Sequence, residues 1–248
     1  MKHLFLTGAT GRLGRIVRKE FSENWCIHPC SRSRGVDLCR AHPGQIITDE
    51  ADLCLNCAAV SSRSTCAEDP CRAFLINSMW PARLADHCYE KGKRLVHLST
   101  DLVYSGGIPP YTETSPAVPR SLYCWTKLLG DRAVIKRNPM ALVVRTSVLV
   151  GRSGAEHPTF TEEILNGTAS RFYVDCFRNH TSIYLLARYL EKALDSSTSG
   201  LVLASAPYSE SRAAYASSIT HEPITLIPAP DNVAKDLTLR PSISLLSN

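Results

Sequence analysis

The stretch "TGATGRLGR", residues 7–15, sets Gly8, Gly11 and Gly14 at intervals of three residues. The apolar run "HLFLT" comes directly before it, and "LGRIVRKEF", which has the apolar spacing of a helix, overlaps its end. Glycines between a strand and a helix let the chain turn tightly and let a pyrophosphate approach the positive end of the helix. A plain strand–helix turn is the alternative, but this context favours a dinucleotide-binding loop.

Apolar runs and helical spacing alternate along the chain up to about residue 150. Strands are predicted over 3–7, 25–30, 52–59, 94–100 and 140–149, and helices over 13–21, 70–92 and 121–137. Pro81 should bend or break the helix over 70–92. This succession predicts an α/β fold with a Rossmann-type doubly wound parallel sheet.

The segment after the second predicted strand is "CSRSRG", residues 30–35. A fold that prefers NAD usually offers Asp or Glu about 20 residues beyond the glycines, to hold the ribose hydroxyls. Here Ser31, Arg32 and Arg34 stand in that place, and guanidinium groups match a 2′-phosphate in charge and geometry. The segment favours NADP(H), against the alternative of a solvated loop with two arginines. Asp37 follows slightly later and could reach the adenine side.

Beyond residue 150 the pattern loosens. Helices are predicted over 160–167, 181–195 and 209–219, and short strands over 200–204 and 224–229. We therefore expect an NADP(H)-binding Rossmann domain over residues 1–150. Residues 151–248 should form a small substrate-binding lobe over the edge where the strands end, interleaved with the main domain and not independent of it.

Composition narrows the classes of partner. The 248 residues are 44% hydrophobic and 21% charged, which suits one large α/β domain with or without a small appendage. The net charge of +5 is not gathered in long basic blocks, so it suits a small anionic ligand better than a nucleic acid. No run approaches the length of a membrane span, and "MKHLFLTGATG" lacks the features of a signal peptide. We expect a cytoplasmic protein that binds neither nucleic acid nor membrane.

Ten cysteines are distributed along the chain, and most have apolar neighbours. In a cytosolic protein they stay reduced, so we expect them to be small buried hydrophobic side chains. Cys54 and Cys57 form a C-x-x-C pattern, but they lie in a predicted strand, where residues three apart point to opposite faces. Because no second pair supports such a site, we predict no metal.

Four residues could serve carbonyl chemistry. The strand over 94–100 ends in Ser99 and Thr100, and hydroxyl residues at the carboxyl end of a parallel strand face the ligand crevice. Downstream, "YCWTK" sets Tyr123 and Lys127 one helical turn apart. Taken separately, Ser99 and Thr100 could simply cap the end of the strand, and Tyr123 and Lys127 could be a pair on the surface of a helix. Beside a cofactor they suit ketone reduction, because a phenol can donate a proton and a nearby ammonium lowers its pKa from about 10.

Several segments together resemble the extended short-chain dehydrogenase/reductases, and within them the dTDP-4-dehydrorhamnose reductase family. They are "GATGRLGR", "NCAAV", "RLVHLSTDLVYSG", "PYTETSPAVPRSLYCWTKLLGD", "VVRTSVLVG" and "VDCFRNHTSIYLLA". The resemblance implies an NADPH-dependent reductase that transfers hydride to the 4-keto group of a nucleotide-linked 6-deoxysugar. It implies a nucleotide-sugar substrate and leaves a homodimer open.

The resemblance also assigns roles to residues. Tyr123 would donate the proton, Lys127 would hold the nicotinamide ribose and lower the tyrosine pKa, and Thr100 would hydrogen-bond the substrate oxygen. The further cofactor-binding residues implied are Gly8, Thr10, Gly11, Arg12, Leu13, Gly14, Ser31, Arg32, Arg34, Asp37, Leu38, Ala58, Ala59, Ser61, Asn77, Ser99 and Thr146. The substrate-binding residues implied are Ser61, Thr100, Asp101, Val103, Tyr123, Ser147 and Arg178.

The chain departs from the family pattern on the substrate side. Cys124 and Thr126 fill the Tyr–Lys segment, where the family usually has Gly and Ser, Val148 stands where an aromatic is frequent, and His180 replaces a proline. Two alternatives stay open. One is an NAD-dependent sugar-nucleotide epimerase or dehydratase, which the arginine-rich loop and Leu102 disfavour. The other is a non-catalytic NADP-binding protein similar to the regulatory subunit of methionine adenosyltransferase.

Overall fold

The computed structural model describes residues 1–21 and 25–245. Seven strands form one sheet in the order β13–β10–β5–β4–β3–β1–β2, and each pair of neighbours is parallel. They are β1 (Lys2–Thr7), β2 (Trp25–Cys30), β3 (Leu53–Asn56), β4 (Arg94–Thr100), β5 (Leu142–Thr146), β10 (Gly200–Ser205) and β13 (Ile243–Ser244). The predicted Rossmann-type sheet is confirmed. Its order reverses between β1 and β3, which is where such sheets bind ligands.

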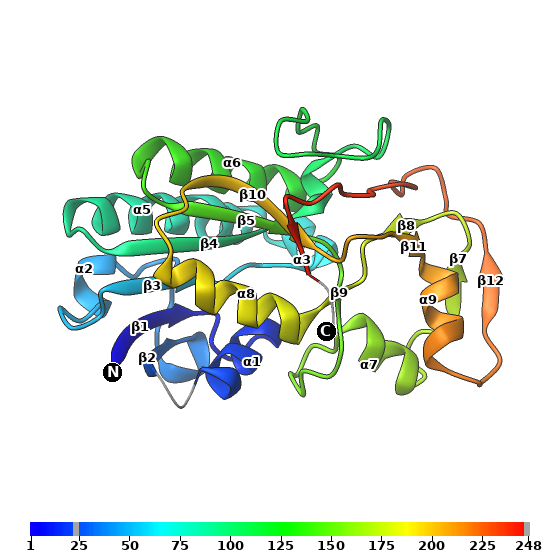
Figure 1. The fold of residues 1–248 in the computed structure, drawn as a ribbon, viewed down its shortest axis with the longest axis horizontal. Helices are drawn as coiled ribbons and strands as arrows, with labels where there is room; N and C mark the ends of the chain where they lie inside the picture. Colours follow the sequence, from blue (N-terminus) through cyan, green and yellow to red (C-terminus); the bar gives the residue numbers. More distant parts are fainter. Residues whose placement is uncertain (22–24, 246–248) are drawn as a thin grey trace.

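Helices cover both faces of this sheet (Figure 1). One face carries α1 (Arg12–Glu20) and α8 (Ile183–Asp195), and the other carries α5 (Trp80–Glu90) and α6 (Leu122–Arg137). Side chains alternate along a strand, so β1 sends Leu4 and Leu6 to the core beneath α1 and Phe5 to the core beneath α5. Burial on both faces explains why the strands read as continuous apolar runs.

The helix predicted over 70–92 is interrupted by a π turn. It consists of α4 (Pro70–Phe74), the π turn (Leu75–Met79) and α5. Pro81 explains the break, because proline has no amide hydrogen and its ring clashes with the carbonyl four residues earlier, that of Asn77. The displaced Asn77 oxygen lies against Gly130 of α6, where a Cβ would stand 2.2 Å from it.

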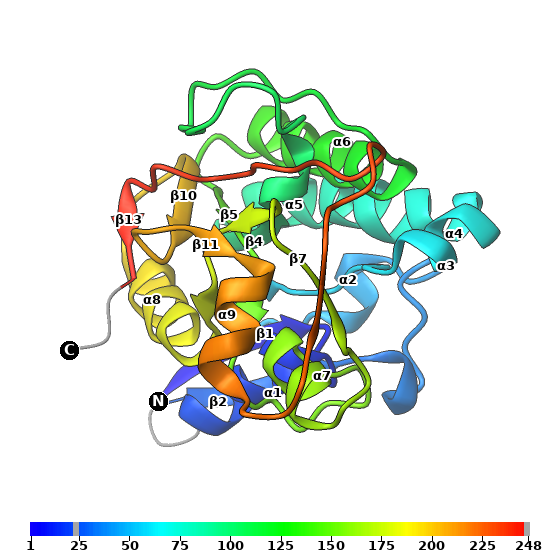
Figure 2. The same cartoon turned by 90° about the vertical axis from the view of Figure 1, so that its right-hand side faces the viewer.

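Residues beyond 150 serve two parts of the molecule. α8, β10 and β13 complete the large sheet and its cover, so the expectation that all pieces after 150 form the lobe is wrong for them. The lobe lies beyond the carboxyl ends of the strands (Figure 2) and packs around Phe160 and Phe172. Its elements are β6 (Leu149–Val150), α7 (Phe160–Leu165), β7 (Arg171–Tyr173), β8 (Phe177–Arg178), β9 (Thr181–Ser182), β11 (Glu210–Ser211), α9 (Arg212–Ile219) and β12 (Thr225–Ile227).

Short elements complete the fold between β2 and α4. They are α2 (Pro43–Ile46) and α3 (Arg63–Glu68), which carry too few residues for a helical period to be recognised. Among the helices of residues 1–21 and 25–245, none is long and apolar enough to cross a membrane.

The cysteines are only partly the buried hydrophobic side chains that we expected. Cys71 is exposed, and Cys26, Cys39 and Cys57 are half-buried. Cys57 lies just beyond β3 and packs toward α1, while Cys54 within β3 packs toward α5. The two cysteines of the C-x-x-C pattern therefore lie on opposite faces of the sheet.

Candidate active site

The glycine-rich turn between β1 and α1 brings two backbone segments into contact. Gly8 has a φ of +68°, and a Cβ on it would stand 2.7 Å from the carbonyl carbon of Cys57. A Cβ on Gly14 would stand 2.2 Å from the Gly8 oxygen, so both positions exclude a side chain. Gly11 is the N-cap of α1, and Arg12 follows it in the first turn. Amide groups and a positive charge therefore meet at a turn whose shape suits a pyrophosphate.

The loop after β2 carries the residues predicted to recognise NADP(H). Ser31 is buried, whereas Arg32 and Arg34 are exposed on a short 3-10 helix. Asp37 accepts a hydrogen bond from the Cys39 amide at 3.1 Å, and this bond holds the pKa of its carboxyl below the ordinary value. Two guanidinium groups thus stand beyond the end of β2, where they can match the charge of a 2′-phosphate.

Thr100, Tyr123 and Lys127 meet at the carboxyl end of β4. Ser121 caps α6 by accepting a hydrogen bond from the Cys124 amide at 3.3 Å, which fixes where the helix begins. Tyr123 and Lys127 then point from α6 into the protein, with 8% and 2% of their surfaces exposed. Thr100 lies close enough to Tyr123 for its hydroxyl to oppose the rise in the pKa of the phenol. The three residues predicted to be catalytic therefore lie together.

Lys127 is held by groups on β4. Its Nζ donates a hydrogen bond to the Leu98 carbonyl oxygen at 2.7 Å and lies 3.4 Å from Nε2 of His97. Burial lowers the pKa of Lys127, and the charges of Asp131 and Cys57 oppose this change. The ammonium is thus fixed in position beneath the crevice before any ligand arrives.

Burial raises the pKa of the Tyr123 phenol above its ordinary value, and the nearby Thr100 hydroxyl opposes this change. The expectation that Lys127 lowers this pKa toward neutrality is wrong for this structure. The lysine donates to the Leu98 carbonyl instead, and desolvation of the phenol dominates. The phenol is therefore protonated at neutral pH, which is the state that a proton donor requires.

A chain of buried polar side chains lies behind Lys127. Oδ1 of Asn56 accepts a hydrogen bond from Nε1 of Trp80 at 3.3 Å, and an indole nitrogen can only donate. Nδ2 of Asn56 therefore donates to Nδ1 of His97 at 2.8 Å. This assigns the proton of His97 to Nε2, which lies 3.6 Å from Oδ1 of Asp131. Burial and the charge of Lys127 lower the pKa of His97 well below its ordinary value, so the ring is neutral.

Asp131 continues this network toward β5. Its Oδ2 accepts hydrogen bonds from the Ser99 hydroxyl at 2.8 Å and from Nε of Arg145 at 3.0 Å. Nη1 of Arg145 donates to the Tyr104 hydroxyl at 3.1 Å. Burial disfavours the Arg145 cation, but Asp131 and Tyr104 outweigh it and raise the pKa of Arg145. We call Asn56, His97, Lys127, Asp131 and Arg145 the buried network.

Asp101 connects the large sheet to the lobe. It begins the 3-10 helix after β4 (Asp101–Val103), and its Oδ2 accepts a hydrogen bond from the Ser147 hydroxyl at 2.6 Å. Burial raises the pKa of Asp101, while the charge of Arg178 and the bond from Ser147 oppose this change. Arg178 belongs to β8 in the lobe and is buried. Three residues predicted to bind substrate therefore gather in one region.

His180 lies in an aromatic stack beside two cations. Its ring centroid is 4.3 Å from that of Tyr215, at an interplanar angle of 8°, and 5.8 Å from that of Phe160. The Arg212 guanidinium carbon lies 4.2 Å from the Phe160 centroid. Burial, with Arg212 and Arg178, lowers the pKa of His180 to about 3. Neither ring nitrogen of His180 has a hydrogen-bond partner among the described residues. We call these five residues the lobe cluster.

The side chains of some predicted site residues pack in the core or bind other protein groups. Val103 is fully buried in an apolar cluster, so the prediction that its side chain contacts substrate is wrong. The Ser99 hydroxyl donates to Asp131, and Leu38 packs in the core beneath α5. Leu13 also packs in the core, which leaves its backbone amide for a ligand.

The loop after β3, with Ala58, Ala59 and Ser61, is fixed by Asn77. Oδ1 of Asn77 accepts a hydrogen bond from the Val60 amide at 2.9 Å, and its Nδ2 donates to the Val60 carbonyl oxygen at 3.1 Å. Ala59 and Ser61 are exposed, and Ala58 is half-buried. Asn77 therefore shapes this loop, and its contact with a cofactor stays a prediction.

Two predicted cofactor residues, Thr10 and Thr146, have polar groups that are available to a ligand. Thr10 is exposed in the glycine-rich turn. Thr146 is the register partner of Thr100 across β4 and β5, and its buried Oγ1 has no hydrogen-bond partner among the described residues. A buried hydroxyl without a partner at the end of a strand fits contact with a ligand atom.

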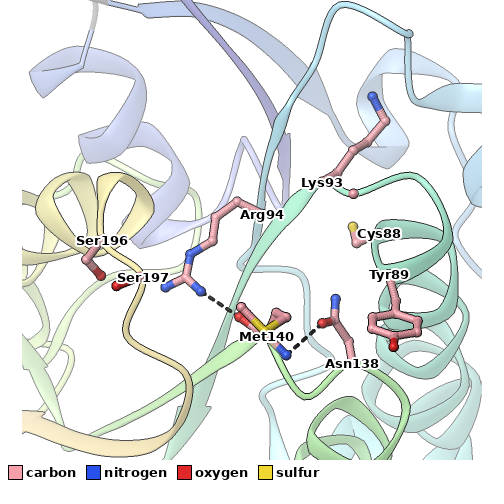
Figure 3. Close-up of a pocket in the computed structure, with 9 residues that line it drawn as sticks. Cys88, Tyr89, Lys93, Arg94, Asn138, Met140, Ser196 and Ser197 are labelled. Carbon is pink, nitrogen blue, oxygen red and sulfur yellow. Dashed lines mark hydrogen bonds between the residues drawn. The ribbon is translucent and has the colours of Figure 1, made fainter.

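A separate cleft of about 290 Å³ opens at the opposite edge of the sheet, around the amino end of β4 (Figure 3). In it, Arg94 donates hydrogen bonds to the carbonyl oxygens of Met140 at 2.7 Å and Thr198 at 2.6 Å. Lys93 donates to the Ala51 oxygen at 2.9 Å. These cations fix loops, so the cleft is not the site of the chemistry described above.

Comparison with known proteins identifies a family and several relatives of this chain. The model of the family described as RmlD substrate binding domain matches residues 1–247. The chain is 37% identical over 159 residues to methionine adenosyltransferase 2 subunit beta of Xenopus tropicalis, across 60% of this chain and 48% of that protein. It is 30% identical over 161 residues to dTDP-4-dehydrorhamnose reductase of Mycobacterium tuberculosis, across 62% of this chain and 53% of that protein. The chain thus spans about half the length of these curated relatives.

A solved structure extends the likeness to the whole fold. The chain superposes on a dTDP-4-dehydrorhamnose reductase from Clostridium acetobutylicum with a TM-score of 0.82 and 28% sequence identity. The superposition covers 92% of this chain and 83% of the other. The lobe is therefore part of the shared architecture, together with the sheet.

Proposed function

Because the chain belongs to the family of the RmlD substrate binding domain, we propose that it is an NADPH-dependent reductase of a nucleotide-linked sugar, acting on the 4-keto group of a 6-deoxysugar. The observation that carries this proposal is the meeting of Thr100, Tyr123 and Lys127 at the carboxyl end of β4. The glycine-rich turn follows β1 at the same edge of the sheet. The relatives named dTDP-4-dehydrorhamnose reductase support the substrate class.

Different residues of the chain have different roles in the proposed reduction. Bound NADPH supplies the hydride that the ketone carbon receives. Tyr123, which burial keeps protonated, donates its proton to the oxygen as negative charge develops there. Thr100 offers its hydroxyl to the same oxygen, and Lys127, fixed by the Leu98 carbonyl, would hold the nicotinamide ribose. The phenolate recovers its proton from solvent.

The lobe cluster supports a nucleotide diphosphate as the remote part of the substrate. Arg178 and Arg212 both lie close enough to His180 to lower its pKa by their charge. Two guanidinium groups in a partly desolvated site suit the paired phosphates of such a molecule. Phe160 and Tyr215 supply flat apolar surface beside them. We therefore assign Arg178, with Arg212, to the diphosphate.

The test is steady-state NADPH oxidation by the purified protein with a panel of dTDP-linked 4-keto-6-deoxysugars. We expect turnover with at least one of them. Tyr123→Phe keeps the ring but lacks the proton, so it should lose about 10²–10⁴-fold in rate while still binding NADPH. Tyr89→Phe, which removes an exposed phenol on α5, should keep the wild-type rate. Reduction by Tyr123→Phe at the wild-type rate would exclude the proposed role.

A binding assay tests the cofactor part separately. NADPH should bind more tightly than NADH, because Arg32 and Arg34 stand where a 2′-phosphate would lie. Equal affinity for the two cofactors would remove NADPH from the proposal and leave the reductase chemistry to be judged by turnover.

A second candidate function is that of a binding subunit. The observation that favours it is the 37% identity to a protein named as a subunit of a methionine adenosyltransferase. A protein of this kind should form a stable complex with a methionine adenosyltransferase, and Tyr123→Phe should leave that complex intact. Complex formation without turnover of any ketone would favour this function over the reductase.

A further inference from the structure

Four potential metal ligands converge at the outer end of the β1–β2 pair, away from the candidate active site. His3 and Cys26 are direct partners in the parallel register of β1 and β2, and His28 is two residues beyond Cys26. Residues two apart in a strand share a face, so the three side chains lie on one side of the sheet. All three are half-buried. Glu50, in the loop between α2 and β3, reaches the same point from above the strand ends.

The ligand atoms of His3, Cys26 and His28 are close enough together to share one coordination sphere. Nδ1 of His3 lies 3.1 Å from Nε2 of His28, which lies 3.8 Å from Sγ of Cys26. The three ligand atoms all lie within 4.8 Å of one another. Oε2 of Glu50 lies 3.6 Å from Nδ1 of His3. Ligands bound tetrahedrally to zinc at about 2.0–2.3 Å are themselves about 3.3–3.8 Å apart, which is close to the separations found here.

We propose that His3, Cys26 and His28 bind a divalent transition-metal ion, zinc, with Glu50 as the fourth ligand. Two imidazoles, a thiolate and a carboxylate are a donor set that zinc accepts in tetrahedral geometry. The two strands hold three of the donors in register. The exposed side chain of Glu50, which is near Nδ1 of His3, would turn inward to complete the sphere. A hydrogen bond between two neutral imidazoles would explain the histidine pair alone and would leave Cys26 and Glu50 without a role.

The prediction of no metal from the sequence considered only cysteines that are close together along the chain. His3 and the pair Cys26 and His28 are 23 residues or more apart in the sequence, and only the parallel pairing of β1 and β2 brings them together. The site joins β1, β2 and the loop that carries Glu50. It lies three residues before Ser31, so we assign it a structural role in fixing the strand that leads to the cofactor loop.

The experiment uses the full chain, freed of metal with a chelator and titrated with zinc by calorimetry, with native mass spectrometry for stoichiometry. We expect one zinc per chain and a rise in the melting temperature when zinc is added. Cys26→Ser and His28→Gln should each weaken zinc binding by at least about tenfold, since even residues that only orient metal ligands have effects of this size. Cobalt in place of zinc should give a tetrahedral spectrum with a thiolate charge-transfer band, which Cys26→Ser should abolish.

Matched controls separate this site from the other thiols and imidazoles. Cys71→Ser and His221→Gln change exposed residues elsewhere and should bind zinc as the wild type does. Circular dichroism of each metal-free variant reports whether it folds. If a variant fails to fold, the cobalt spectrum of the wild type still shows whether a cysteine thiolate binds the metal. A wild-type protein that takes up no zinc, that shows no thiolate band with cobalt, or whose zinc survives both Cys26→Ser and His28→Gln would overturn the proposal.

Discussion

The buried network and the lobe cluster both contain buried polar residues, but they satisfy their polar atoms differently. In the buried network, protein groups supply most of the partners: Asn56 donates to His97, and Oδ2 of Asp131 accepts from Ser99 and Arg145, while Oδ1 of Asp131 has no hydrogen-bond partner among the described residues. In the lobe cluster, both ring nitrogens of His180 have no hydrogen-bond partner among the described residues. The catalytic side is therefore organised by the protein itself, whereas the lobe presents polar groups that a ligand could complete.

The largest expected effect is on the catalytic side, from Lys127→Met. The thioether roughly fills the space of the lysine stem but carries no charge and leaves the Leu98 carbonyl without its donor. We expect activity to fall by about 10²–10⁴-fold, with weaker NADPH binding. Combined with Tyr123→Phe, the loss should be little greater than that of the poorer single variant, because residues that act as a unit are not additive.

The control is Lys136→Met, an exposed lysine on the same helix, which should keep full activity. Rates and cofactor affinities of the wild type, the two single variants, the double variant and Lys136→Met are measured with the best ketone substrate. Losses that simply multiply in the double variant would show that Tyr123 and Lys127 act independently.

Asp131→Asn tests whether the buried network is a structural unit. It leaves the Arg145 cation buried beside a neutral amide, and breaking a buried ion pair from one side costs about 3–5 kcal/mol of unfolding free energy. Asp195→Asn makes the same change in the exposed pair with Lys2, where about 0–1 kcal/mol is expected. Urea unfolding measures both. Similar small losses in the two variants would mean that the network contributes no more than a surface pair.

Arg178→Ala tests the lobe side. A remote contact to a diphosphate contributes equally to substrate and transition state, so KM should rise more than kcat falls. Loss of a charged hydrogen bond costs about 1.5–3 kcal/mol, which corresponds to a rise in KM of about 10- to 150-fold. Arg171→Ala, at an exposed position on β7, should leave KM unchanged. An unchanged KM in Arg178→Ala for every accepted sugar nucleotide would remove the diphosphate from the lobe cluster.

The smallest expected effect is on the pH dependence of stability. Burial and two arginines lower the pKa of His180 from 6.5 to about 3, so the ring is neutral when folded and gains a proton when unfolded. Its contribution to stability is complete above pH 6.5 and is lost as the pH falls toward 3. His180→Phe keeps a ring to stack on Tyr215. It should therefore reduce the stability lost between pH 7 and 4.5 by about 1–3 kcal/mol.

His97 is also buried and neutral, so some loss of stability in acid should remain in His180→Phe. His221→Gln, an exposed position, serves as the control and should follow the wild-type curve. Urea unfolding across this pH range gives the curves. A His180→Phe curve that coincides with that of the wild type would contradict the assignment of a neutral, desolvated His180.

The sequence predicted the large elements because their signals are periodic and long. β2, predicted over residues 25–30, has those bounds in the structure. The two- and three-residue strands of the lobe, such as β8 and β7, are too short to carry a period and form only through pairing with distant segments. The resemblance assigned Val103 to the substrate, but the 3-10 helix after β4 turns its side chain into the core.

The sequence contains signals of the buried network, although none of them predicted it. His97 and Arg145 each interrupt an apolar strand, and a polar residue in a buried strand must find a partner. Asp131 lies one helical turn beyond Lys127 on α6. Only the register of β4 and β5 shows which of these groups meet, since Ser99 pairs with Arg145 across the two strands.

The π turn before α5 sets the rotational phase of a long helical segment. An α-helix advances about 100° per residue, so the extra residue of a π turn rotates everything after it by roughly that angle. Within the π turn, Asn77 faces the loop at Val60, and directly after the turn, Trp80 faces Asn56 in the sheet. Deleting one residue from this turn would remove this rotation, and only one of these two contacts could then keep its direction. The extra residue thus lets a single segment serve both the cofactor loop and the buried network.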